Sequence, residues 1–203
     1  MRNGGRATCA EVLLNTGECK DDGVQSEEKM DKRKVEKITA LVIGVAVVCL
    51  SFSGIKDWQT VGIYAGCGWW GRLLYSFFHA NFLHAALNAW CLVSIVFIYD
   101  IKMWRLLLSF AIAATVPVGI ISRVVGGFIT PTVGLSGVVF VLFGTLSFEV
   151  LRKWYYQMWM LFYLSVGFLF PNTNAWLHLY CYLAGLTIAL LNKPIKINGN
   201  GKQ

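Results

Sequence analysis

Long apolar stretches alternate along this chain with short polar or glycine-rich segments. A helix that crosses a bilayer needs about 20 mostly apolar residues. Six stretches approach that length, at residues 38–55, 73–99, 104–121, 136–149, 155–170 and 175–191. The pattern predicts an all-α membrane protein built as a six-transmembrane-helix bundle. The second stretch is too long for one upright span, so we expect its first turns at the interface and the span proper to begin near His84.

The segments between these stretches differ in character. The first loop, residues 56–72, is less hydrophobic and rich in glycine, and it contains Trp69 and Trp70, whose amphipathic rings suit the membrane–water boundary. We therefore expect an interfacial first loop. The loop before the fourth stretch contains several glycines and Pro131, residues typical of a break between helices. Ser136 follows it directly, which predicts a serine at a helix start.

The two ends of the chain are polar. Residues 1–37 are mixed in charge and lack a hydrophobic signal-peptide core, which predicts a disordered cytoplasmic tail. Residues 38–192 form the expected membrane domain, and residues 193–203 a short cytoplasmic C-terminal tail. Met30 stands directly before a basic cluster, so it is an alternative translation start.

The distribution of Lys and Arg predicts the orientation. Positive side chains concentrate on cytoplasmic loops. If the N-terminal tail lies in the cytoplasm, ten Lys and Arg residues lie near the cytoplasmic ends of the stretches and three near the outer ends, which places both termini in the cytoplasm. The ten are Lys32, Arg33, Lys34, Lys37, Lys102, Arg105, Arg152, Lys153, Lys193 and Lys196, and the three are Lys56, Arg72 and Arg123. His84, Ser136 and His178 then lie near the outer ends of their spans, at one depth.

Composition agrees with a membrane protein and narrows the chemistry. The chain is 56% hydrophobic and 14% charged, with a net charge of +7. Because the basic residues flank apolar runs, the lipid bilayer rather than nucleic acid accounts for this charge. The six cysteines are scattered, with no disulfide framework and no Cys-x-x-Cys metal motif. We expect no metal and no cofactor.

Polar groups placed in hydrocarbon are costly and suggest function. Ser136, Phe140 and Gly144 are spaced i, i+4, i+8 and share one helix face, and His178 and Gly185 share a face of the last stretch. Small residues let helices approach closely, which would bring Ser136 to His178. A serine becomes a nucleophile when a neighbouring base takes its proton. No aspartate lies near His178, so the pattern favours a dyad over a triad.

A second pair of polar residues lies on the second stretch. His84 and Asn88 are i, i+4 neighbours, and both can donate hydrogen bonds from one helix face. Together with the backbone N–H of Ser136, they would stabilise a developing oxyanion.

Each motif also has a structural interpretation. Gly-x-Ser-Gly alone is typical of helix packing, and His178, or His84 with Asn88, can serve as hydrogen-bonding links between helices.

A zinc site would require His-Glu-x-x-His, whereas His79 and His84 are five residues apart without an intervening Glu. An aspartyl protease would require two membrane aspartates, and only Asp100, at a span end, is near. A transporter or channel remains an alternative, although no acidic residue lies mid-span.

Three motifs, in order, resemble the rhomboid family. His79-Ala-Asn-Phe-Leu-His84-Ala-Ala-Leu-Asn88 is similar to its His-x4-His-x3-Asn pattern, Gly134-Leu135-Ser136-Gly137 to its Gly-x-Ser-Gly, and His178 with Gly185 to its last-helix motif. The resemblance covers residues 38–192.

The resemblance implies an intramembrane serine protease that cleaves transmembrane proteins in or beside their membrane helices. Ser136 would be the nucleophile and His178 the general base and then the general acid. His84, Asn88 and the Ser136 N–H would form the oxyanion site, and His79 would hold the first loop. Gly134, Gly137 and Gly185 would be supporting residues, and Phe140 stands where many members carry an aromatic that stacks on the catalytic histidine.

The chain departs from the family pattern at two places. Cys181 replaces the glycine common three residues after the last-helix histidine, and we expect its larger side chain to widen the approach of the two helices. The first-loop Trp-Arg pair is here Trp70-Gly71-Arg72, which predicts an altered role for the arginine.

A catalytically inactive rhomboid-like protein that binds transmembrane helices is the alternative from another class. Such relatives usually lack the serine or the histidine, and this chain has both. The compact six-span layout, by family analogy, suggests a multi-pass protein of a bacterial inner membrane.

Overall fold

The computed structural model describes residues 22–55, 57–170 and 173–192 of the chain. It divides into two units, Met1–Val35 and Glu36–Gln203. The described part of the first unit is the beginning of helix α2 (Asp22–Leu50), and the second unit contains the rest of α2 and all later helices. Helix α2 therefore begins within the segment where the sequence predicts disorder. The predicted C-terminal tail and residues 1–21 lie outside the described residues.

The first loop of the second unit is partly helical. It contains two short helices, α3 (Trp58–Val61) and α4 (Trp69–Leu74), which the sequence analysis did not predict. Beyond α3, Ile63 and Thr132 exchange backbone hydrogen bonds of 2.9 and 3.0 Å, and the Ala65 N–H donates to the Phe128 carbonyl. The first loop is thereby fixed to the loop that precedes Ser136.

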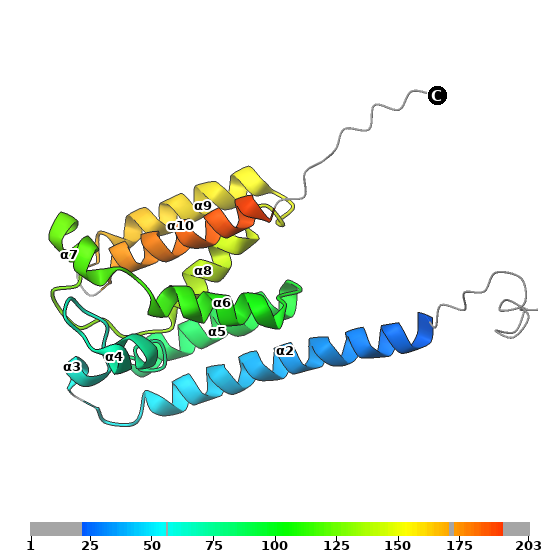
Figure 1. The fold of residues 1–203 in the computed structure, drawn as a ribbon, viewed down its shortest axis with the longest axis horizontal. Helices are drawn as coiled ribbons and strands as arrows, with labels where there is room; N and C mark the ends of the chain where they lie inside the picture. Colours follow the sequence, from blue (N-terminus) through cyan, green and yellow to red (C-terminus); the bar gives the residue numbers. More distant parts are fainter. Residues whose placement is uncertain (1–21, 56, 171–172, 193–203) are drawn as a thin grey trace, which may run out of the picture. The chain divides into compact units, whose positions relative to one another are not determined.

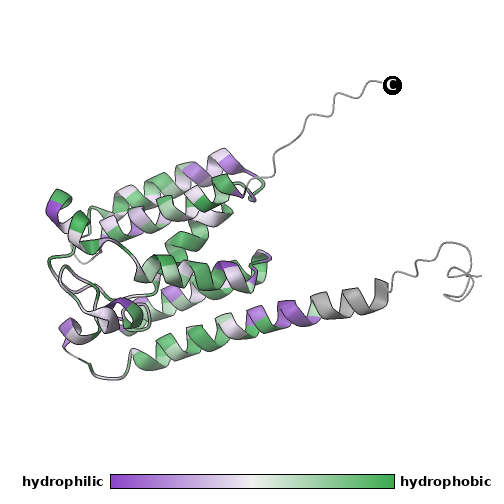
Figure 2. Cartoon of the chain, in the orientation of Figure 1, coloured by the Kyte–Doolittle hydropathy of each residue, from purple (hydrophilic) through white to green (hydrophobic). Residues whose placement is uncertain are grey.

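The longer helices that follow α2 overlap with the predicted apolar stretches. They are α5 (Phe82–Ile98), α6 (Met103–Ala114), α8 (Ser136–Leu146), α9 (Lys153–Gly167) and α10 (Ala175–Leu191). Helix α5 begins two residues before His84. Figure 2 shows apolar residues along these helices and polar ones mainly near their ends.

The third stretch is not one helix. It is broken after Ala114 and continues as α7 (Val118–Val125), with a bend of 52° between α6 and α7. Pro117 lies in the break, where its missing N–H removes a helical hydrogen bond. The helix also runs further than predicted, to Val125, because the left-handed Gly126 (φ 71°) is what ends it.

Helix α8 is the centre of the second unit. All its residues except Phe143 are buried, because it packs against α10, α6 and α5 (Figure 1). A helix that is apolar all round, like α8, requires such neighbours on every side. Its N-terminal residue is Ser136, so the best-packed helix of the molecule positions the candidate nucleophile.

The helices that follow α2 are short for a bilayer. No single helix in the described ranges is long and apolar enough to span a bilayer, but the bent pair of α6 and α7 together meets the criterion. The prediction of six separate spans stays a prediction.

The closeness of α8 and α10 leads to a testable expectation. A Cβ added at Gly144 would lie 2.6 Å from the Leu186 nitrogen and 2.8 Å from the Gly185 carbonyl carbon, all backbone atoms that cannot move aside alone. We expect Gly144→Ala to destabilise the protein by roughly 1–3 kcal/mol, measured as a lower thermal midpoint in detergent micelles.

Gly119→Ala is the matched control, because Gly119 lies within helix α7 and a Cβ there meets nothing within 4 Å. It should keep or raise the midpoint. An equal loss in both variants would contradict the packing described here.

Candidate active site

Ser136 is held at the start of α8 by an unusual loop conformation. Gly134 has a φ of +139°, which L side chains rarely adopt. A Cβ there would also lie 3.1 Å from Cε1 of His84. The following residue, Leu135, donates its N–H to Nε2 of His79 at 3.0 Å. Since Ser136 is the first residue of its helix, its own N–H has no acceptor within α8.

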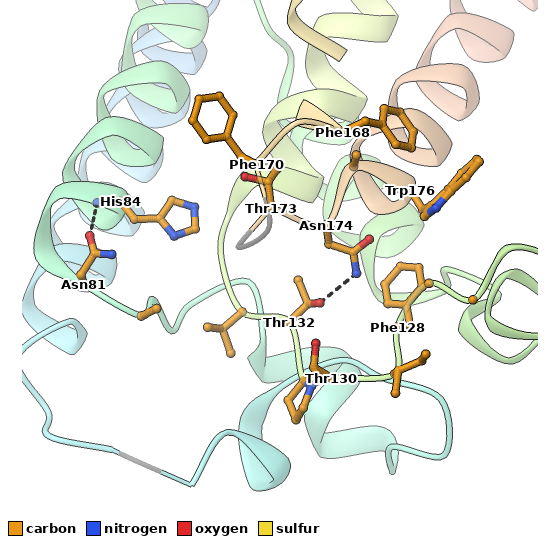
Figure 3. Close-up of a pocket in the computed structure, with 17 residues that line it drawn as sticks. Asn81, His84, Phe128, Thr130, Thr132, Phe168, Phe170, Thr173, Asn174 and Trp176 are labelled. Atoms are coloured by element: carbon orange, nitrogen blue, oxygen red, sulfur yellow. Dashed lines mark hydrogen bonds between the residues drawn. The ribbon is translucent and has the colours of Figure 1, made fainter. Parts of the chain in front are cut away.

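His178 is placed by the cap of α10. The Asn174 side-chain oxygen accepts a hydrogen bond from the Leu177 N–H, as an N-cap residue does. Its amide nitrogen donates to the Thr132 hydroxyl at 2.9 Å, which ties the start of α10 to the loop before Ser136 (Figure 3). His178 lies one turn beyond this cap.

Ser136 and His178 meet across α8 and α10. The distance between Ser136 Oγ and His178 Nε2 is 2.9 Å, a normal hydrogen bond. The Phe140 ring stacks on the imidazole with ring centroids 4.3 Å apart and planes inclined by 14°. Ser136 is buried and His178 half-buried. The imidazole is therefore held between a flat aromatic ring and the hydroxyl.

The helices that carry the pair touch through their backbones. A Cβ at Gly185 would lie 3.0 Å from the Gly144 Cα and closer still to the Val141 carbonyl oxygen. Cys181 does not widen this approach, contrary to the sequence-based expectation. Its fully buried thiol packs beside Gly137, where a Cβ would lie 3.5 Å from Sγ, so the absent side chain of Gly137 leaves room for it.

The His84 motif lies beside the same loop. Asn81 caps α5 by accepting the His84 N–H at 2.9 Å, which sets His84 on the first turn. The His84 ring lies against Gly134 and edge-on to His79, with ring centroids 5.0 Å apart. Asn88 is buried and donates to the His84 carbonyl at 3.0 Å. The structure thus connects Asn88 to the His84 backbone, and no contact between Asn88 and Ser136 is described.

His79 contacts the Ser136 loop rather than only the first loop. To accept the Leu135 N–H, its Nε2 must be unprotonated. The pKa of His79 is lowered to about 4, mainly by burial and then by the neighbouring His84, while the backbone at Phe77 acts in the opposite direction. His79 is consequently neutral at physiological pH and suited to its role as an acceptor.

A cavity of about 680 Å³ opens beside His84 (Figure 3). Loop residues 126–133, Phe168, Phe170 and segment 173–176 line it, with Ala80, Asn81 and His84 on the other side. Its described lining contains aromatic rings, threonines and asparagines but no Asp, Glu, Lys or Arg. Among the described residues, neither Ser136 nor His178 lines this cavity.

The described residues contain no cluster of three or more His, Cys, Asp or Glu side chains that could bind a metal ion.

Sequence reasoning missed several residues that build the site. Asn174 was not singled out, although an asparagine directly before an apolar run is a common helix-start signal. Arg72 crosses to the broken end of α6 and donates to the Val116 carbonyl at 2.8 Å, and the backbone of Tyr75 contacts the Gly134 N–H. Nothing in the spacing of the chain reveals these two contacts. The first depends on the break at Pro117, and the second joins two loops that are far apart in the sequence.

The chain is thus a helical protein in which a serine and a histidine from two packed helices are hydrogen-bonded to each other. Comparison with known families identifies a Rhomboid domain at residues 66–194. The chain therefore belongs to the rhomboid family, whose members are membrane-embedded. No curated protein and no solved structure matched the chain.

The acceptor role of His79 predicts a pH dependence of stability. With a pKa of about 4 in the folded protein and about 6.5 when unfolded, the neutral ring contributes stability that is complete above pH 6.5 and is lost as the pH falls towards 4. We expect the thermal midpoint of the wild type to fall over this window.

His79→Gln is the comparison, because its side-chain oxygen can accept a hydrogen bond without titrating. The variant should show a shallower decline over the same window, with the remaining decline due to other groups. Parallel curves for the two proteins would contradict the assignment.

Proposed function

We propose that this protein is an intramembrane serine endopeptidase that hydrolyses peptide bonds in or near the transmembrane segments of other membrane proteins. One observation carries the proposal: the 2.9 Å hydrogen bond between Ser136 Oγ and His178 Nε2 within a rhomboid-family chain. A serine beside an imidazole is the minimum required for acyl transfer through a covalent intermediate.

In the first half of the reaction, His178 Nε2 takes the proton of Ser136 as Oγ attacks the carbonyl carbon of the scissile bond. The carbonyl oxygen becomes an oxyanion. The protonated His178 then gives its proton to the leaving nitrogen as the C–N bond breaks, which releases an amine and leaves an acyl ester on Ser136.

In the second half, a water molecule loses a proton to His178 and attacks the ester carbon. A second oxyanion forms, and its collapse returns the proton to Ser136 Oγ and releases the carboxylic acid. No aspartate is assigned to orient His178. The Phe140 ring, stacked on the imidazole, would restrict the orientation of His178 in its place.

The oxyanion would be stabilised by the Ser136 N–H, which has no acceptor in its helix, and by His84 and Asn88. The proximity of His84 to Gly134 supports its part. Asn88 donates to the His84 carbonyl, and its second amide hydrogen is the one it would offer to the oxyanion. A hydrogen-bond donor aimed at a developing charge in a dry site typically lowers the activation barrier by about 3 kcal/mol.

The substrate class follows from this chemistry and its surroundings. A carbonyl in a membrane helix is already hydrogen-bonded, so the segment must unwind before Ser136 can attack. Sites near glycine, proline or other helix-weakening residues would be cleaved most readily. The described lining of the adjacent cavity is uncharged, which would suit such segments. The protein would be a multi-pass enzyme of a bacterial inner membrane, with both termini in the cytoplasm.

The direct test is cleavage of a reporter with a transmembrane segment, co-expressed with the full chain. Ser136→Ala should abolish cleavage while the variant accumulates in the membrane at the wild-type level, because alanine removes only the nucleophile.

Ser147→Ala is the matched control, since Ser147 is a fully buried serine just past the other end of α8. It should retain cleavage. Cleavage that persists in Ser136→Ala would overturn the proposal. A wild type that binds the reporter without cutting it would favour a helix-binding rhomboid-like protein.

A further inference from the structure

The break between α6 and α7 leaves a backbone carbonyl without its helical partner. In a continuous helix the Ala113 carbonyl would accept the N–H of residue 117, but that residue is proline and has none. An unpaired buried carbonyl is costly. The structure supplies a replacement from the first loop, because the Tyr75 hydroxyl donates to the Ala113 carbonyl at 2.9 Å.

The same tyrosine contacts the candidate active site at two further points. Its backbone carbonyl accepts the Gly134 N–H at 2.8 Å. Its hydroxyl lies against Gly137, since a Cβ there would come within 2.7 Å of the hydroxyl oxygen. Tyr75 is fully buried. It thus touches the residues two before and one after Ser136 while it is anchored to the end of α6.

Resting on the proposed function, we propose that Tyr75 is a positioning residue for Ser136. The hydroxyl fixes the ring between the broken end of α6 and the first turn of α8, and the backbone carbonyl fixes the loop that precedes Ser136. Together with His79, which accepts the Leu135 N–H, it holds two successive N–H groups directly before the nucleophile. Tyr75 does not touch the reacting atoms and acts through the orientation of the Ser136 turn.

The test is the rate at which a fluorescent fluorophosphonate labels the purified full chain in detergent, normalised to folded protein. Tyr75→Phe keeps the ring and the backbone carbonyl and removes only the hydroxyl. We expect the limiting rate of labelling to fall about tenfold, because small displacements of a reacting group are costly. The half-saturating probe concentration should not change.

Tyr156→Phe is the matched control, because the Tyr156 hydroxyl also donates to a backbone carbonyl of a neighbouring helix, that of Phe143 at 2.7 Å. Tyr156→Phe removes the same kind of hydrogen bond from the C-terminal half of α8, about two helical turns from Ser136. The variant should lose a similar amount of thermal stability and keep the wild-type labelling rate. The inference would be overturned if wild type and Tyr75→Phe were labelled at equal rates, or if Tyr156→Phe lost as much of the labelling rate as Tyr75→Phe does.

A second pair of variants tests the contact with Gly137 and serves if Tyr75→Phe does not accumulate alone. The methyl group of Gly137→Ala would clash with the Tyr75 hydroxyl at 2.7 Å, whereas its next neighbours, Cys181 Sγ and Ala113 Cβ, would lie at ordinary distances of 3.5 and 3.6 Å. Removing the hydroxyl should relieve this clash. Gly137→Ala/Tyr75→Phe should therefore be labelled faster than Gly137→Ala, and an equal or slower rate would contradict the proposed contact.

Labelling of the wild type distinguishes a failure of the proposed function from a failure of the role of Tyr75. If wild type is not labelled, the proposed function fails and the inference fails with it, because no reactive serine is present to be positioned. If wild type is labelled on Ser136 and Tyr75→Phe is labelled equally fast, only the role of Tyr75 fails.

Discussion

The close approach of α8 and α10 at Gly144 and Gly185 is the constraint on which the candidate site depends. With no side chain at either glycine, backbone atoms of the two helices are in contact, and this spacing lets a serine on one helix reach a histidine on the other. Buried α8 residues around Gly144 fill the remaining space. Small residues serve the same purpose in membrane proteins generally, where close packing contributes more to helix association than the hydrophobic effect does. The Ser136–His178 bond is therefore a result of helix packing as well as of side-chain chemistry.

The first loop is the second element that holds the candidate site in place. Arg72 and Tyr75 satisfy carbonyls at the broken end of α6, while the Tyr75 carbonyl and the His79 ring hold the N–H groups that precede Ser136. One short segment thus compensates for the helix break and fixes the start of α8. These four bonds pair backbone groups that would otherwise lack a partner at the break and before Ser136, whereas Nδ1 of His79 is buried without a hydrogen-bond partner among the described residues. On the opposite side, Asn174 connects the cap of α10 to Thr132, so both reacting residues share one loop as a support.

Much of the candidate site was accessible from the sequence because its signals are local or chemically rare. Ser136 follows a glycine-rich loop and His178 lies in an apolar stretch. Polar residues are costly in such surroundings and therefore suggest a function. The glycine spacing on each helix indicated which faces would meet. The break at Pro117 was not predicted, because residues 104–121 read as one continuous apolar run, and the helical form of residues 22–37 was not predicted from their polar composition. The effect of Cys181 was misjudged, since the space for its thiol is provided by Gly137 on another helix, a pairing that spacing along one chain does not reveal.

The most direct test of the account is to locate a covalent adduct. The full chain would be treated with a fluorophosphonate and digested, and the modified peptide identified by mass spectrometry, for wild type and for His178→Ala. The account predicts modification of Ser136 alone in the wild type and none in His178→Ala, since without its base the hydroxyl is an ordinary alcohol. Absence of an adduct from folded wild-type protein, or equal modification of Ser136 in both proteins, would contradict the claim that His178 activates Ser136.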